Sequence, residues 1–287
     1  MHVLILTPDP QDPSFHGRWR DVFQRMAAPL EAEGVTVSGQ SWDEATTPQA
    51  DLILPLMAWG YHRRIGDWQS ACDRWAREGL PVLNAPPVLS WNADKSYLAD
   101  LEARGCAIVP TLFRDTPGPV DLAEAVHRFG CEQVVVKPRV SASAYRTLRV
   151  RPGDSLEGGP EGPAMIQPYM ASVERTGELS MIYLGGAFSH AIRKVARAGD
   201  FRVQPEYGGI ISKVEPSPAE QAAAELVLKA AGADVLYARI DLVDGPDGSP
   251  LLIEAELIEP DLYLSFDPAA PGRFVRAVLA ARAGGAV

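Results

Sequence analysis

The stretch that most constrains this chain runs from Tyr237 to Glu256. Two apolar runs with an alternating pattern flank an Asp247-Gly248 pair in this stretch. Alternation around Asp-Gly is typical of a β-hairpin closed by a two-residue turn in which both central residues have positive φ. If Asp247 and Gly248 form that turn, Pro246 pairs with Ser249, and the pairing of both strands follows.

The predicted pairing gathers charged side chains on one face of the hairpin. It places Asp241 opposite Glu254 and Arg239 opposite Glu256. Carboxylates that lie directly across a β-ladder repel each other, so the three acids need a compensating cation. A hard ion that prefers oxygen ligands, such as Mg²⁺, is the natural candidate. The alternative is a half-exposed hairpin whose acidic face is only solvated.

Composition narrows the class of protein. The 287 residues suffice for two or three packed units, and 46% hydrophobic with 22% charged residues is typical of a soluble globular chain. No apolar run approaches the ~20 residues of a membrane span, and the N-terminus enters a strand-like run without a cleavable leader. We therefore expect a cytoplasmic protein without a membrane partner.

Charge and cysteine content exclude further classes. A formal net charge of −10 argues against non-specific nucleic-acid binding, which needs clustered cations. The three cysteines, Cys72, Cys106 and Cys131, are widely spaced and indicate neither a disulfide framework nor a paired zinc site. The oligomeric state is left open, with a homodimer as one option.

Residues 1–85 alternate strand and helix patterns, which predicts a parallel α/β unit. Strands are predicted at 3–6, 35–37, 51–58 and 81–84, and helices at 19–33 and 66–77. The first strand is not followed by Gly-x-Gly-x-x-Gly, so a dinucleotide fingerprint is absent. Open α/β sheets bind ligands just after strand ends. A group of side chains lies at such positions here, and a substrate role and a place in solvated loops are equally compatible with the sequence. The side chains of this group are His16, Arg18, Arg20, Trp59, His62, Arg63 and Arg64.

The region from 91 to 170 begins with a predicted helix that Asn92 or Asp94 would cap, so that Lys95 lies in its first turn. Helix N-termini favour anions, so this lysine would be better placed beside a bound anion; an ordinary surface lysine is the alternative. Shorter strands follow at 108–113, 133–137, 147–151 and 165–169, with a helix at 121–129. They predict a small α+β lid subdomain.

A basic loop lies within this lid. Between Lys137 and Arg151 the chain carries five basic residues and no acid, with small residues at 141–144 that include Ser141 and Ser143. Such a reversal of charge in an acidic protein predicts a mobile loop that closes over polyphosphate. The alternative is a solvated basic hairpin.

The region from 171 to 287 predicts an antiparallel sheet. Its elements are a hairpin at 179–195, a helix at 218–231, the acidic hairpin and a final helix at 271–281. Arg193, Lys194 and Arg202 lie on strand or loop positions near glycines, where backbone can approach an anion closely.

Several of these motifs together resemble the ATP-grasp superfamily, closest to the glutathione-synthetase and ribosomal-S6-modification type ligases. The superfamily motifs are Lys95, Val135-Val136-Lys137-Pro138, the run from Met165 to Tyr169, and the acidic set of the hairpin. The branch that includes the cycloserine synthetases is resembled by Asn92-Ala93-Asp94-Lys95, Gln167-Pro168-Tyr169, Phe188-Ser189-His190 and Glu256-Leu257-Ile258-Glu259-Pro260. The resemblance implies an ATP-grasp fold, with an N-terminal parallel α/β domain (1–90), a helix and central lid subdomain (91–170) and a C-terminal antiparallel-sheet domain (171–287).

The resemblance also implies roles for individual residues. Lys95 and Lys137 would contact ATP phosphates, and Gln167, Pro168 and Tyr169 would form the adenine hinge. Ser141, Ser143, Arg193 and Lys194 would complete the nucleotide site. Asp241, Glu254 and Glu256 would hold Mg²⁺, with Mn²⁺ as the alternative ion, and Arg202 and Arg239 would lie near the transferred phosphate. Many relatives have Asn where this chain has Glu256, so the number of metal ions stays open. Relatives often have a glycine-rich loop where this chain has Arg139-Val140-Ser141-Ala142-Ser143-Ala144, so Ser and Arg side chains would replace backbone contacts to phosphate there.

The implied activity is that of a carboxylate-amine ligase. The γ-phosphate of ATP would activate a carboxylate on a small, amino-acid-like substrate, and a nitrogen nucleophile would attack the acyl phosphate. Phosphoryl transfer needs cations and positioning rather than a protein nucleophile, and no Ser-His-Asp or Cys-His spacing competes. Ligation and cyclisation both stay open, as does the pathway, with antibiotic biosynthesis among the expectations. The alternative is a non-catalytic module that binds or senses ATP, which would not need three metal ligands.

Overall fold

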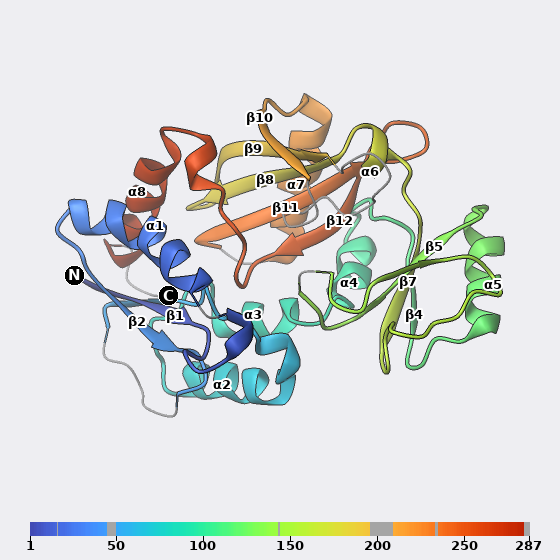
Figure 1. Cartoon of the computed structure of the whole chain (residues 1–287). Helices are drawn as coiled ribbons and strands as arrows, with labels where there is room; N and C mark the ends of the chain where they lie inside the picture. The colour runs from blue at the N-terminus through green and yellow to red at the C-terminus, as the bar shows by residue number, and fades with distance from the viewer. Residues whose placement is uncertain (16, 45–49, 143, 196–208, 233–234, 284–287) are drawn as a thin grey trace.

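The computed structural model describes residues 1–15, 17–44, 50–142, 144–195, 209–232 and 235–283. Within these residues three β-sheets follow one another along the chain, and helices pack between and around them (Figure 1). None of the helices in these ranges is both long and apolar enough to cross a membrane.

The first sheet is parallel, as the alternating patterns predict, with strand order β2-β1-β3. Its strands are β1 (His2–Thr7), β2 (Thr36–Ser41) and β3 (Leu52–Leu54). The helices and 3₁₀ turns of this region are η1 (Pro13–Phe15), α1 (Arg18–Ala32), η2 (Tyr61–Arg63), α2 (Ile65–Arg77) and α3 (Pro86–Asn92). The strand expected at 81–84 is reduced to one bridge between Ile53 and Val82, because Pro81 has no N–H to extend a ladder.

The second sheet is antiparallel, with order β4-β7-β5-β6, and α5 covers one of its faces (Figure 1). Its elements are β4 (Leu112–Arg114), α5 (Pro119–Phe129), β5 (Val134–Pro138), β6 (Leu148–Val150) and β7 (Ala164–Pro168). Leu122 and Ala125 of α5 pack on Val134, Val136 and Ile166, so this sheet has its own hydrophobic core.

The third sheet is antiparallel, with order β10-β9-β8-β11-β12. Its strands are β8 (Glu178–Leu184), β9 (Ala187–Val195), β10 (Ile210–Val214), β11 (Tyr237–Asp244) and β12 (Pro250–Glu256). The helices of this part are α6 (Ser172–Arg175), α7 (Pro218–Ala231), η4 (Leu264–Phe266) and α8 (Ala270–Ala283). Both predicted hairpins are present.

The acidic hairpin has the predicted pairing at its charged positions but a different tip. Asp241 lies opposite Glu254, as expected, whereas Asp244 pairs with Pro250, and a bulge next to Asp241 accounts for the shift. The turn runs from Gly245, whose carbonyl accepts from the Gly248 N–H, and only Gly248 has positive φ, at +83°. Pro246 has a fixed negative φ that suits the second position of such a turn, so the expected Pro246–Ser249 pair and a left-handed Asp247 were wrong.

Lys95 also lies slightly away from its predicted position. The helix that follows it, α4 (Tyr97–Ala103), begins two residues later, and Asp94 accepts the Ser96 N–H at 2.8 Å. Lys95 therefore precedes α4 on a tight turn and does not lie in the first turn of the helix. The backbone N–H of Lys95 donates to the carbonyl of Arg139 at 2.9 Å, which ties this turn to the end of β5.

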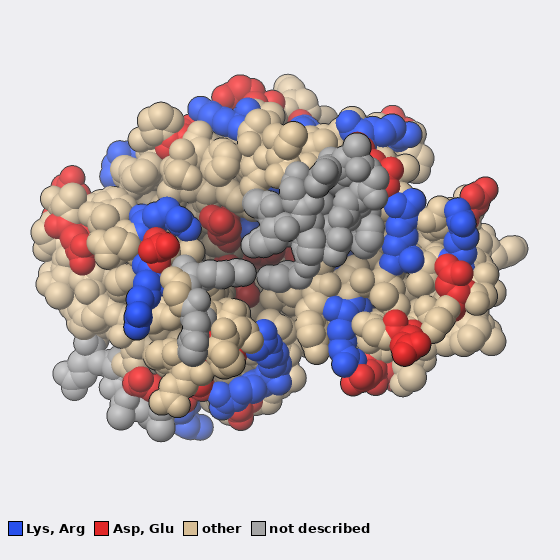
Figure 2. All heavy atoms as spheres, viewed as in Figure 1, with Lys and Arg blue, Asp and Glu red and all other residues tan. Residues whose placement is uncertain are grey.

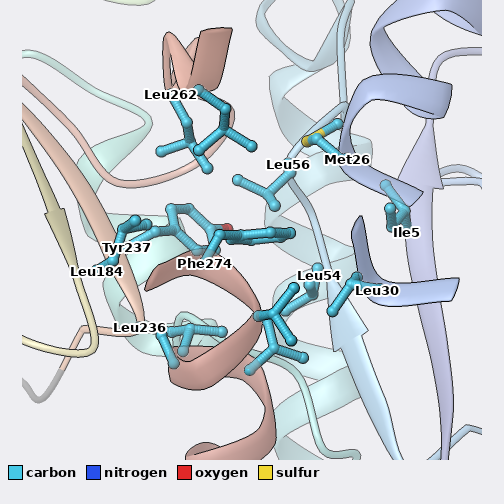
Figure 3. Close-up of a cluster of buried hydrophobic side chains, with 14 of the residues drawn as sticks. Ile5, Met26, Leu30, Leu54, Leu56, Leu184, Leu236, Tyr237, Leu262 and Phe274 are labelled. Atoms are coloured by element: carbon cyan, nitrogen blue, oxygen red, sulfur yellow. The ribbon is translucent and has the colours of Figure 1, made fainter. Parts of the chain in front are cut away.

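The first and third sheets share a hydrophobic core. Leu54 and Leu56 face Tyr237 of β11 and Phe274 of α8, with Leu30 of α1 alongside (Figure 3). Burial of this kind is the main stabilising term of a fold. Since this core joins residues from both ends of the chain, the division at 90 and 170 stays a prediction.

A buried asparagine bridges the same two regions. Asn84 is fully buried, and its side-chain N–H groups donate to the carbonyls of Tyr237 at 3.0 Å and Leu257 at 2.7 Å. Its side-chain oxygen accepts the Leu236 N–H at 2.8 Å. Asn84 thereby satisfies three backbone groups at the ends of β11 and β12.

We predict that Asn84→Ala lowers the free energy of unfolding by about 2 kcal/mol or more, because a buried backbone group without a partner costs about 1–3 kcal/mol. Urea denaturation of the variant and parent gives this value directly. Gln69→Ala, at an exposed position on α2, is the control and should stay close to the parent. Equal stabilities of parent and Asn84→Ala would contradict the bridging role.

Candidate active site

A cavity of about 1150 Å³ lies where the three sheets meet. Figure 2 shows acidic side chains in a hollow near the centre of one face. Most of the residues proposed from the sequence line this cavity: Lys95, Lys137, Ser141, Gln167, Pro168, Tyr169, Lys194, Arg239, Asp241, Glu254 and Glu256. Ser143, Arg202 and His16 lie outside the described residues.

Arg239 is the central cation of the acidic hairpin. Its Nε lies 3.1 Å from both carboxylate oxygens of Asp241, and its Nη2 contacts Asp241 at 3.0 Å and also Glu256. Burial opposes ionisation of Asp241, but the charges of Arg239 and Lys194 outweigh it and hold the pKa of Asp241 at about 2. Side-chain cations therefore already supply part of the compensating charge that the acidic face was expected to need.

A buried pair that the sequence did not reveal adjoins Asp241. Lys194 on β9 contacts Glu178 on β8, and its Nζ lies 3.6 Å from Asp241. Burial disfavours the charged lysine, but the two carboxylates raise its pKa well above the ordinary value. Glu178 and Lys194 lie directly opposite each other in the β8–β9 ladder, which is the signal that could have identified Glu178.

Lys95 and Lys137 flank the carboxylate of Glu254. The Lys95 Nζ lies 3.2 Å from Glu254 and donates to the Ser141 carbonyl at 2.6 Å. Burial raises the pKa of Glu254, but both lysines outweigh it and lower that pKa overall. Burial lowers the pKa of Lys137, with Glu254 opposing that change. Lys95 is buried, so it is no ordinary surface lysine.

The carboxylates near Glu256 are only partly compensated by cations. Burial raises the pKa of Glu256 to about 8, since Arg239 offsets burial only in part and Glu254 adds to the effect. Burial likewise raises the pKa of Glu259, which sequence reasoning missed, to about 7. A site that disfavours its own carboxylate charges fits a further cation.

The acids fit a hard metal ion in their chemistry, because all their donors are carboxylate oxygens. Glu254 and Glu256 lie on the same face of β12, whereas the oxygens of Asp241 are engaged by Arg239 and Ser180. Among the described residues, no three His, Cys, Asp or Glu side chains meet in a group that could hold an ion. The metal assignment therefore stays a prediction.

The predicted adenine hinge also lines the cavity. Gln167 is buried on β7 and donates to the Thr111 hydroxyl at 3.0 Å. The Tyr169 ring lies 3.5 Å from the guanidinium carbon of Arg149, and its hydroxyl contacts Glu174.

Some predicted cations lie outside the cavity. Arg193 is next to Lys194 on β9, so its side chain points to the other face, where it pairs with Glu220 at 2.8 Å. Its assignment to the nucleotide site does not agree with this position. Of the group after the first-sheet strands, Trp59 lines the cavity, whereas Arg63 pairs with Asp12 at 3.1 Å.

The basic loop of the lid has fewer unpaired cations than its composition indicates. Three of its arginines pair with acids from elsewhere in the chain: Arg139 with Asp94 at 2.7 Å, Arg146 with Glu161 at 2.6 Å and Arg149 with Glu174 at 2.8 Å. Lys137 and Ser141 remain on the cavity wall.

Two comparisons with known proteins each match DcsG, a protein of cycloserine biosynthesis. A family model of the N-terminal domain of D-cycloserine synthetase DcsG matches residues 3–84. The cycloserine biosynthesis protein DcsG of Streptomyces lavendulae is 30% identical over 269 residues, which cover 85% of this chain and 88% of that protein.

Solved structures show the same fold. The crystal structure of D-cycloserine synthetase DcsG matches with a TM-score of 0.83 and 23% identity over 98% of this chain and all of that one. A D-alanine–D-alanine ligase from Bacillus anthracis matches with a TM-score of 0.71 and 15% identity over the full length of both chains. The ATP-grasp fold expected from the sequence is confirmed.

We predict that replacing the two glutamates of β12 has opposite effects on stability in EDTA. The folded-state pKa of Glu256, about 8, exceeds the ordinary value of 4.5, so the folded state binds a proton more tightly and loses stability as pH rises between these values. Glu256→Gln should therefore gain melting temperature relative to the parent, and more at about pH 8 than at about pH 5. Glu254→Gln should melt below the parent at about pH 8, because Lys95 and Lys137 lose their partner.

Thermal unfolding of parent and both variants at the two pH values measures these differences. Glu254→Gln is the matched control, because it removes the same charge two residues away. Two variants that shift the melting temperature equally at both pH values would contradict the charge balance described above.

Proposed function

Because this chain belongs to the ATP-grasp ligases, in the family of the cycloserine biosynthesis protein DcsG, it is an ATP-dependent enzyme that forms a C–N bond, and we propose that it activates a small amino-acid-like carboxylate as an acyl phosphate. The observation that carries this proposal is the gathering of four cations, Lys95, Lys137, Lys194 and Arg239, beside the acidic hairpin in one cavity. Cations positioned around transferring phosphate are the main requirement of such chemistry.

Nucleotide binding is proposed along the side of the cavity formed by the second sheet. Lys95 and Lys137 would bind the phosphates, with Ser141 beside them, and the strand end from Gln167 to Tyr169 would hold adenine. The short distance between Lys95 and Glu254 supports this, because the lysine ammonium is held at the border between the second and third sheets. Binding phosphate there would replace a carboxylate partner by a more highly charged one.

A divalent ion, Mg²⁺ or alternatively Mn²⁺, is proposed to be held by Glu254, Glu256 and Asp241. The raised pKa values of Glu256 and Glu259 support an additional cation at this end of the cavity. The ion would neutralise charge on the phosphates and act as a Lewis acid.

Arg239 is proposed to bind the transferred phosphoryl group or the acyl phosphate. Its guanidinium is buried beside the acidic face and already contacts two carboxylates, so it can hold an oxyanion without being solvated. Burial of the site also keeps water away from an intermediate that hydrolyses readily. The role of Arg202, outside the described residues, stays a prediction.

The substrate is proposed to be an amino-acid derivative used in cytoplasmic small-molecule biosynthesis, since the relative with 30% identity is a cycloserine biosynthesis protein. Cyclisation of one molecule and ligation of two are both compatible with an acyl phosphate. A non-catalytic ATP sensor is not favoured, because the cavity keeps its acidic hairpin together with the cations.

An ADP-release screen tests the proposal. Purified protein with Mg²⁺ and ATP is offered single amino acids, dipeptides and O-ureidoserine, and the products are identified by mass spectrometry. We expect substrate-dependent release of ADP and phosphate together with a product that has lost the elements of water. No release above background with any carboxylate would contradict the proposed reaction.

We predict that Lys95→Ala and Lys137→Ala each weaken binding of a non-hydrolysable ATP analogue. Loss of one charge-assisted phosphate contact should cost about 1.5–3 kcal/mol, which titration calorimetry measures. Lys229→Ala, at an exposed position in the last turn of α7, is the control and should bind as the parent does. Unchanged affinity in both cavity variants would remove these lysines from the site.

We also predict that Glu254→Gln abolishes most turnover, because one of the carboxylates proposed to hold the metal is lost. The control, Glu225→Gln on the exposed side of α7, should keep the turnover of the parent. Steady-state ADP release with the best substrate of the screen measures both. Full activity of Glu254→Gln would rule out this metal ligand.

A further inference from the structure

Tyr263 has a backbone conformation that tyrosine rarely adopts. It lies between β12 and η4 with φ of 45° and ψ of 37°, in the left-handed region. A bulky residue with positive φ is an outlier, and such strain persists only where the surroundings hold it. Outliers of this kind occur often at ligand sites.

A buried histidine holds the backbone of Tyr263. The Nε2 of His190 on β9 donates to the Tyr263 carbonyl at 3.1 Å, and Nδ1 accepts from the Ser189 hydroxyl at 2.9 Å. The carbonyl can only accept, so Nε2 carries the hydrogen and the ring orientation is defined. On the other side, the Tyr263 N–H donates to Asp261 at 2.8 Å. The Ser189-His190 pair is a motif that the proposed mechanism leaves unused.

The conformation turns the Tyr263 side chain towards the cavity. Its ring lines the cavity beside Arg239, whose guanidinium carbon is 5.8 Å from the ring centroid. The ring of Phe266 supports it edge-on, with centroids 5.8 Å apart. Among the described residues, no hydrogen bond involves the phenol hydroxyl. Burial raises the pKa of Tyr263 to about 12, so the hydroxyl keeps its proton and can donate.

A hydroxyl donor without a partner among the described residues, next to the cation of the site, fits an anionic oxygen of a bound ligand. A role in packing alone would need only the ring, and it would not explain why a strained backbone and a buried histidine turn the hydroxyl end into the cavity. The carboxylate that the proposed reaction activates has such oxygens, and Arg239 is the cation beside which it would lie.

We propose that Tyr263 is a specificity-determining residue that donates a hydrogen bond to the carboxylate or acyl oxygen of the substrate beside Arg239, and that His190 is a positioning residue that keeps Tyr263 in its left-handed conformation. This inference rests on the proposed function, because it assigns a residue to the same carboxylate. It adds a neutral donor from the segment after the acidic hairpin to a site otherwise built from charges.

The test compares three variants with one matched control. Tyr263→Phe removes only the hydroxyl, His190→Leu removes the donor to the Tyr263 carbonyl, and His190→Gln keeps a donor at a similar reach. The control is Tyr183→Phe, because the Tyr183 hydroxyl is also without a partner but lies buried in the core of the third sheet. Steady-state ADP release gives KM and kcat for O-ureidoserine, or for the best carboxylate of the screen, and KM for ATP.

We expect Tyr263→Phe and His190→Leu to raise KM for the carboxylate about tenfold, as the loss of one hydrogen bond to a charged group implies. KM for ATP should stay within about twofold of the parent. His190→Gln should restore KM for the carboxylate, and Tyr183→Phe should leave both constants unchanged. An unchanged KM for the carboxylate in Tyr263→Phe, or a His190→Gln variant as poor as His190→Leu, overturns the proposal.

The experiment distinguishes a variant that does not fold from a failure of the proposed function. If His190→Leu does not fold, Tyr263→Phe and His190→Gln decide. If the parent releases no ADP with any carboxylate, the proposed function fails. Calorimetric titration of O-ureidoserine into parent and Tyr263→Phe, each with Mg²⁺ and a non-hydrolysable ATP analogue, then decides the role of Tyr263. Weaker binding by the variant supports that role, and equal binding or none by either protein refutes it.

Discussion

The covered edge of β12 is the constraint on which the site depends. This strand carries Glu254 and Glu256 at the edge of the third sheet, where unpaired backbone groups need partners. The Tyr97 hydroxyl accepts the Ala255 N–H at 2.9 Å, and Asn92 bonds both the Ala255 carbonyl and the Leu257 N–H at 2.9 Å. Because the segment around α4 covers this edge with side chains, Lys95 comes within 3.2 Å of Glu254. One set of hydrogen bonds thus protects the edge and joins the two halves of the cavity.

The charges of the cavity form pairs that a ligand can exchange. Buried charges are tolerated only when they are paired, and here Lys95, Lys194 and Arg239 each have a carboxylate partner on another strand. In the proposed reaction the phosphates would take over the cations, while a metal ion would take over the carboxylates. The partners are thus already in place before binding, and little reorganisation is needed when charge develops.

Local patterns predicted the hairpins of the third sheet and the pairing of charged residues across one of them. Period-two alternation and glycine pairs predicted both hairpins of the third sheet, and with them the pairing of Asp241 with Glu254. The tip of the acidic hairpin was missed because Pro246 favours another turn. Arg193 was misplaced because the sequence shows that two adjacent residues are basic but does not show which of them faces the cavity. The number of unpaired cations in the basic loop was overestimated, because their acidic partners, such as Glu161 and Glu174, lie beyond the loop in the chain.

The sequence by itself determined the order of the elements and the acids of the hairpin, because these depend on neighbours along one strand and on turn residues. The ATP-grasp class came from the resemblance of several motifs to that superfamily. Only the tertiary structure decided that Lys95 pairs with Glu254, that Glu178 and Glu259 join the acids, and that His190 holds Tyr263. These contacts join strands and loops that are separate in the chain. Their distances follow from how the sheets pack, and burial and charge then act on whichever groups that packing brings together.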